Sequence, residues 1–66
     1  MARFTIFKDK AGEYRWHFQA SNNRIIAGSE GYNNKLDCAH SIDLMKRDAP
    51  AAAVYDETVP AQQRGF

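Results

Sequence analysis

The sequence has few residues that could staple or ligate a small fold. It contains one cysteine, Cys38, and two histidines, His17 and His40. One cysteine cannot form a disulfide within the chain. A structural zinc site needs four ligands, usually clustered Cys and His residues, which the chain does not offer. We therefore expect no metal and no cofactor.

The sequence also has no marked excess of charge of one sign and no long apolar run. Nine basic and eight acidic residues leave a formal net charge of +1, so no strong attraction to nucleic acid or acidic membranes is expected. No apolar run approaches the ~20 residues of a membrane span. Residues 1–8 alternate in polarity and do not form the apolar centre of a signal peptide. These features predict a cytoplasmic protein without a membrane partner.

The length sets a further limit. A chain of 66 residues holds one domain, and so short a domain usually needs a disulfide, a metal or a partner subunit for stability. The first two are not expected, so the sequence favours oligomerisation.

Three strands are predicted from alternating apolar residues and turn chemistry. Residues 3–8 and 13–20 alternate, and residues 9–12 contain Asp and Gly, which together indicate a β-hairpin. Asparagines at 22 and 23 favour a second tight turn, leading to a third strand at residues 24–29.

A helix is predicted from Asn34 to Ala49. Asn34 can cap it, and Asp37 three residues later suits the positive end of the helix dipole. The apolar stripe of this helix consists of Cys38, Ile42, Met45 and Ala49.

Residues 51–57 are predicted to form a short fourth strand, and residues 58–66 a loosely ordered tail. The expected fold class is therefore α+β: a two-layer β-β-β-α-β unit at residues 1–57, with one helix packed on an antiparallel sheet.

Four stretches in this order resemble a known family: Phe7-Lys8-Asp9-x-x-Gly12-x-Tyr14-Arg15-Trp16, Ile25-Ile26-Ala27-x-Ser29-Glu30-x-Tyr32-x-x-Lys35, Cys38 with Ile42, and Lys46. They resemble the YegP-like family of small bacterial proteins, which carry a domain of unknown function. The resemblance covers residues 3–57. Residues from Thr58 onward match no pattern of the family.

The resemblance implies units that work in pairs, either as tandem repeats in one chain or as two subunits. Such paired units share a sheet and exchange their C-terminal strands. For a chain with a single unit, it implies a homodimer whose exchanged interface consists of Val54, Tyr55, Asp56 and Glu57. The family has no established activity, so the resemblance implies no catalytic residues.

Several side chains have both a chemical and a structural interpretation. His17 could act as a base, but a solvated histidine on a sheet face is the simpler interpretation. Cys38 lies on the apolar stripe and is interpreted as a buried small hydrophobe, pointing to a different helix face from His40. The aromatic face of Tyr14, Trp16 and Phe18 is interpreted as core and not as a base-stacking platform.

Basic residues suggest one alternative function. The sheet face away from the helix is predicted to carry a nucleic-acid surface formed by Arg3, Arg15, His17 and Arg24, with Lys8 nearby. A solvated polar face explains the same residues. The sequence predicts a non-enzymatic homodimeric module that contacts an unidentified protein, with weak nucleic-acid binding as the alternative.

Overall fold

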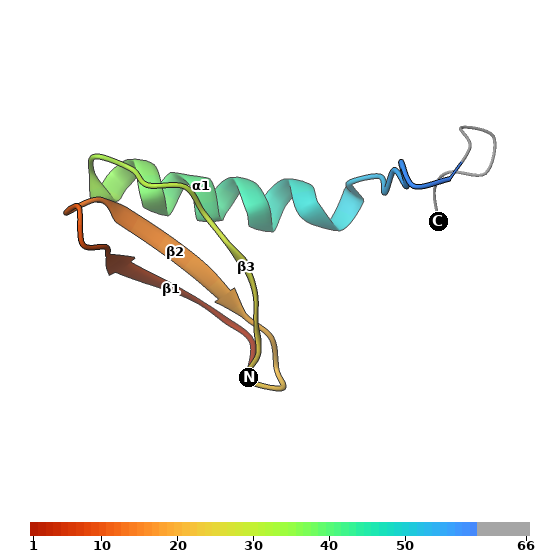
Figure 1. The fold of residues 1–66 in the computed structure, drawn as a ribbon, viewed down its shortest axis with the longest axis horizontal. Coiled ribbons are helices and arrows are strands. Elements are labelled where there is room, and N and C mark those ends of the chain that lie inside the picture. The colour runs from red at the N-terminus through yellow and green to blue at the C-terminus, as the bar shows by residue number, and fades with distance from the viewer. Residues whose placement is uncertain (60–66) are drawn as a thin grey trace.

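The computed structural model describes residues 1–59. Its elements are strands β1 (Arg3–Lys8), β2 (Tyr14–Gln19) and β3 (Ile25–Gly28), helix α1 (Lys35–Asp48) and the 3-10 turn η1 (Ala49–Ala51). The strands form one antiparallel sheet in the order β1-β2-β3, and α1 crosses one face of it (Figure 1). This confirms the predicted α+β class with one helix on an antiparallel sheet.

The first hairpin closes through the predicted turn. The Asp9 amide donates to the Glu13 carbonyl at 2.9 Å, and the Gly12 amide donates to the Asp9 carbonyl at 3.1 Å. Gly12 has a φ of +82°, a conformation that costs little without a Cβ atom. The Asp9 Oδ1 atom also accepts from the Ala11 and Glu13 amides at 2.9 and 3.0 Å, so this carboxylate organises the whole turn.

The second turn is held by Asn23, which has a φ of +68°. Its backbone N–H donates to the Ala20 carbonyl at 2.9 Å. Asparagine tolerates this region better than most side chains. The β2–β3 register then shifts between Phe18 and Gln19, a bulge that interrupts the ladder. Beyond β3 the chain pairs again where Tyr32 bridges Tyr14.

Helix α1 begins at the predicted cap. The Asn34 Oδ1 atom accepts from the Asp37 amide at 2.8 Å, and the Asn34 backbone is extended. The helix ends at Asp48, one residue before the predicted end, because the chain tightens into η1, which contains Pro50. A proline can occupy the first turn of such a helix because it needs no amide donor there.

The core is thin. Only Trp16 (5% exposed) and Cys38 (0%) are buried among the described residues. The Trp16 ring lies edge-on to Phe4, with centroids 5.1 Å apart, and Phe4 contacts Phe18 at 4.9 Å. The aromatic face is therefore core, as predicted, although Phe4 and Phe18 are only half-buried.

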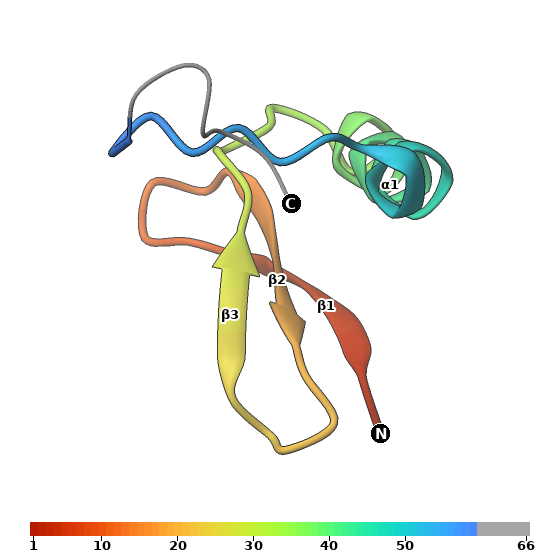
Figure 2. The same ribbon diagram turned by 90° about the vertical axis from the view of Figure 1, so that its right-hand side faces the viewer.

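The helix covers one side of the sheet. It contacts β2 and β1 but not β3, as the view along its axis shows (Figure 2). The helix and the sheet also diverge toward the C-terminal end of α1 (Figure 1). The predicted apolar stripe is consequently buried only at its beginning: Cys38 is fully covered, Met45 is 39% exposed and Ala49 is exposed.

The predicted fourth strand does not form within the single chain. Residues 52–56 contain no strand, and a turn starts at Glu57, although Ala52 has an extended backbone. A strand requires a neighbouring backbone, and here the chain runs on beyond the sheet after α1 (Figure 1). Of the predicted tail, residues 60–66 lie outside the described part.

Candidate functional site

The sheet face opposite α1, here called the outer face, carries several of the predicted basic residues. The β1–β2 register pairs Arg3 with Gln19, Thr5 with His17, and Phe7 with Arg15, and paired side chains point to the same side. The Phe7 and His17 rings lie 5.2 Å apart, tilted by 40°. The structure thus brings Arg3, Arg15 and His17 together on one face, as predicted.

Lys8, which was predicted to lie near this face, is on the opposite side of the sheet. It pairs with Tyr14 on the side that bears α1, and its Nζ atom lies 5.1 Å from the centre of the Tyr14 ring. The period of two along a strand places Lys8 with Phe4 and Ile6, since all three are separated by even numbers of residues.

Arg15 is on the outer face but is already bound by its own chain. Its Nε atom donates to the Asp9 Oδ2 atom at 2.5 Å, and its Nη1 atom donates to the Ser29 carbonyl at 3.2 Å. The hydrogen bond lowers the pKa of Asp9 and raises the pKa of Arg15. Arg15 therefore joins the first turn to the exit of β3, and its charge is neutralised locally.

The outer face is electrostatically divided. Glu13 and Glu30 also attract the Arg15 guanidinium electrostatically. Together with Asp9, they place three acidic residues at the end near the first turn. The other end carries Arg3, opposite Gln19. Arg24 is exposed just before β3, and its carbonyl accepts from the Ala20 amide. The predicted basic patch thus narrows to one end of the sheet.

The reactive side chains lie apart from one another. Cys38 is completely buried, and its burial raises the pKa of the thiol, which disfavours the nucleophilic thiolate. His40 is exposed on another face of α1. Within residues 1–59, no group of three or more His, Cys, Asp or Glu side chains is placed to hold a metal ion.

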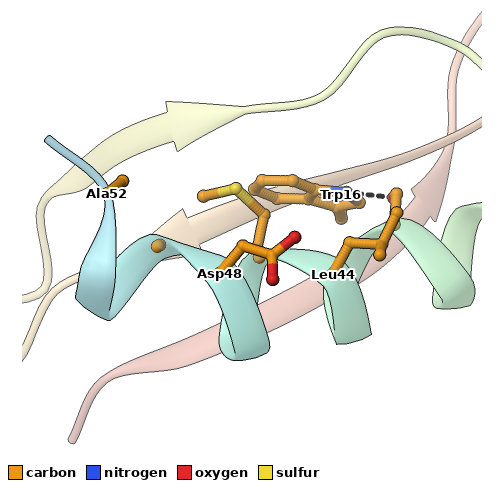
Figure 3. Close-up of a pocket in the computed structure, with 7 residues that line it drawn as sticks. Trp16, Leu44, Asp48 and Ala52 are labelled. Atoms are coloured by element: carbon orange, nitrogen blue, oxygen red, sulfur yellow. Dashed lines mark hydrogen bonds between the residues drawn. The ribbon is translucent and has the colours of Figure 1, made fainter.

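A groove opens between the sheet and the C-terminal half of α1 (Figure 3). It has a volume of about 550 Å³. This groove, here called the α1 groove, is lined by Trp16, Ser41, Leu44, Met45, Asp48, Ala49 and Ala52.

The wall of the α1 groove is apolar because its central polar atoms bond to each other. The Trp16 Nε1 atom donates to the Ser41 Oγ atom at 2.7 Å, drawn as a dashed line in Figure 3. The Ser41 hydroxyl in turn donates to the Cys38 carbonyl at 2.7 Å. The hydrogen bond between Trp16 and Ser41 was not predicted. The one indication of it in the sequence is that Ser41 lies three residues after Cys38, on the same side of the helix.

The residues predicted to form a dimer interface are largely open to solvent in the single chain. Val54 is 55% exposed and Tyr55 is 76% exposed. Asp56 accepts from the amide and the hydroxyl of Thr58, which lowers the pKa of Asp56, and Glu57 is exposed. Val54 and Tyr55 are therefore two consecutive large apolar side chains that are exposed to solvent in the single chain.

The architecture defines the class of protein: a small two-layer α+β domain with a three-stranded meander and one helix. Residues 9–56 match the family described as a domain of unknown function, DUF1508. The chain belongs to this family, whose curated relatives are called UPF0339 proteins, and the match confirms the YegP-like resemblance.

Two solved relatives share the fold. The solution structure of protein ATU0232 from Agrobacterium tumefaciens is 45% identical and has a TM-score of 0.75, covering 88% of this chain and 94% of that one. The solution structure of a protein from Haloferax volcanii is 39% identical, with a TM-score of 0.77 and coverage of 83% and 93%. Haloferax is an archaeon, so the expectation of a purely bacterial family was too narrow.

A third relative differs in length. The UPF0339 protein in the ptx operon 5' region of Stutzerimonas stutzeri is 42% identical over 53 residues, which are 80% of this chain but 48% of that protein. That relative is therefore about twice as long as the matched unit. None of these names states an activity. In the described part of this chain, no helix is long and apolar enough to cross a membrane.

Proposed function

We propose that this protein is a non-enzymatic, cytoplasmic homodimer that acts through protein contacts, with Val54–Glu57 exchanged between the two chains. The observation that carries the proposal is the amount of surface left open. The chain exposes 5445 Å², whereas a compact monomer of this mass exposes about 4,200 Å². The excess exceeds the ~800 Å² that each partner buries in a standard interface.

The shape of the chain supports the same conclusion. The radius of gyration is 14.7 Å, against about 11 Å for a compact domain of this length. Both β1 and β3 are edge strands within residues 1–59, so each sheet edge can accept a strand from a second copy. The double-length relative in Stutzerimonas stutzeri fits a unit that works in pairs.

Light scattering coupled to size-exclusion chromatography tests the assembly. We expect a dimer mass for the full chain and a monomer or unfolded chain after deletion of residues 52–66. A wild-type chain that elutes as a folded monomer would overturn the proposal. A truncated chain that stays folded and dimeric would retain the dimer but refute the exchange.

The non-enzymatic part of the proposal rests on Cys38 and His17. The Cys38 thiol is inaccessible, and the described contact of His17 is with the Phe7 ring, a hydrophobic neighbour. A broad hydrolase and transferase screen is expected to give no rate that depends on either residue. A rate lost in either Cys38→Ala or His17→Gln, with folding intact by circular dichroism, would contradict it.

Weak nucleic-acid binding is the second candidate, and one observation favours it. The Phe7 and His17 rings pair on the outer face, which also carries Arg3. Rings on such a surface can stack with unpaired bases.

Fluorescence anisotropy with a single-stranded oligonucleotide at 50 and 200 mM salt tests this candidate. Binding should weaken with salt and fall further in the Arg3→Ala, Arg24→Ala double variant. Arg47→Ala is the matched control, since Arg47 is an exposed cation on α1 that pairs with Asp48. Binding that does not change in the double variant eliminates the outer face.

A further inference from the structure

One glycine of the sheet is not explained by the fold of the chain. Gly12 has a positive φ, and a Cβ atom at Gly31 would collide with the Glu13 side chain. Gly28 has no positive φ, and an added Cβ atom would meet only the Trp16 carbonyl oxygen, at an ordinary contact distance of 3.7 Å. Glycine weakens a strand and often marks a bulge or the close approach of a ligand. The β2–β3 bulge lies nearer the second turn, so Gly28 fits the close approach of a ligand.

The open space at Gly28 lies on the outer face, beside an aromatic ring. Gly28 pairs with His17, so the position of its missing side chain is about 5 Å from the His17 Cβ atom, on the same side of the sheet. The Phe7 ring, on β1, lies 5.2 Å from the His17 ring. Within residues 1–59, β3 contacts no element except β2, and it forms one edge of the sheet (Figure 2). The backbone at Gly28 is therefore open to solvent.

We propose that the space above Gly28 binds one unpaired base of a single-stranded nucleic acid, stacked beside the His17 ring. The inference rests on nucleic-acid binding, the second candidate function above, and adds where a base is held. A base is flat and presents a π-face on which aromatic side chains stack, and a backbone without a side chain lets it approach closely. Within residues 1–59 the His17 ring nitrogens make no hydrogen bond, so they are free to meet the polar edge of a base.

The charges of the outer face determine where the phosphates lie. Arg3 is one strand repeat, about 6.8 Å, from the β1 residue that pairs with His17. No ion pair within residues 1–59 involves Arg3, so its exposed guanidinium keeps its charge for a phosphate. At the other end Arg15 is neutralised by Asp9, and the acidic residues there repel phosphate. A strand with one base at Gly28 therefore directs its phosphates toward Arg3.

A pair of valine substitutions tests the base site. The backbone and the space at Gly28 accept a side chain, so Gly28→Val should fold while the valine occupies the position of the base. Ala27→Val is the matched control, because it enlarges the neighbouring residue of β3, which pairs with Phe18 on the α1 side of the sheet. In fluorescence anisotropy with a short oligothymidine at low salt, we expect the dissociation constant to rise about fivefold to a hundredfold for Gly28→Val, and to be unchanged for Ala27→Val.

A second probe separates base stacking from phosphate attraction in the wild-type chain. An abasic oligomer of the same length keeps every phosphate and has no base to stack. It should bind more weakly than the oligothymidine, and Gly28→Val should not change its affinity. In ¹⁵N–¹H correlation spectra of the full chain, the oligothymidine should shift the amide signals of His17 and Gly28, and the abasic oligomer should leave the Gly28 signal in place.

The outcomes separate the base site from nucleic-acid binding in general. A wild-type chain that binds neither probe refutes nucleic-acid binding and the site with it. Oligothymidine binding that is equal in the wild type and Gly28→Val retains nucleic-acid binding but refutes the base site. Should Gly28→Val not fold, the wild-type spectra decide, because amide shifts that leave out His17 and Gly28, or that both probes produce equally, also refute the base site.

Discussion

Replacing Ser41 by alanine is expected to destabilise the protein because it leaves the indole N–H of Trp16 without its acceptor. The Ser41 Oγ atom accepts the indole hydrogen at 2.7 Å, and Trp16 is only 5% exposed. A buried donor without an acceptor costs about 1–3 kcal/mol. Alanine is a better helix former than serine and returns about 0.5 kcal/mol in the middle of α1. The expected net loss in unfolding free energy is therefore about 0.5–2.5 kcal/mol.

A double-mutant cycle with Trp16→Phe isolates this hydrogen bond. Phenylalanine has no ring donor, so Ser41→Ala in that background should be close to neutral or slightly stabilising. The assay is urea unfolding followed by far-ultraviolet circular dichroism, at one protein concentration because an assembling chain unfolds in a concentration-dependent way. If Ser41→Ala costs the same in both backgrounds, the indole hydrogen bond is not the source of its effect.

Three further results are expected. Trp16→Ala should cost about 3–5 kcal/mol, a large share of the ~3–10 kcal/mol available to a chain of this size. A loss below ~1 kcal/mol in urea unfolding would contradict the core described here. Asp9 has a lowered pKa in the folded state, so its stabilising effect is present above the ordinary carboxyl pKa and is lost as the pH falls through the folded value. Asp9→Asn keeps the acceptor oxygen of the turn and should therefore flatten the fall in thermal stability over that acidic range. A variant with the wild-type pH profile would refute this. The Cys38 thiol should react with a thiol reagent at least ~100-fold more slowly in the native protein than in urea, and equal rates would show that Cys38 is accessible.

Much of the local structure follows from the sequence because its causes are local. The Asp9–Gly12 turn and the Asn34 cap each depend on one side chain that accepts from a backbone amide a few residues away. The second turn depends on the left-handed backbone of Asn23 and its backbone hydrogen bond to Ala20. The alternation in β1 and β2 identifies the aromatic face for the same reason, since the side-chain period of a strand is fixed by its backbone.

The interaction surfaces depend on contacts between distant parts of the chain. Arg15 is neutralised because the folded hairpin brings Asp9 beside it, and the carbonyl of Ser29 lies 14 residues away in sequence. Trp16 and Ser41 are 25 residues apart, so nothing in the local sequence pairs them.

The sequence alone determined the three strands, the helix and the aromatic face, because strand period, turn chemistry and capping act within a few residues. Only the tertiary structure decided which of those faces are covered. The angle between α1 and the sheet leaves Met45 and Ala49 open, and the path of the chain after Ala51 leaves residues 52–56 without a strand to pair with. Both features arise because a segment becomes a strand or a core only when another surface is placed against it.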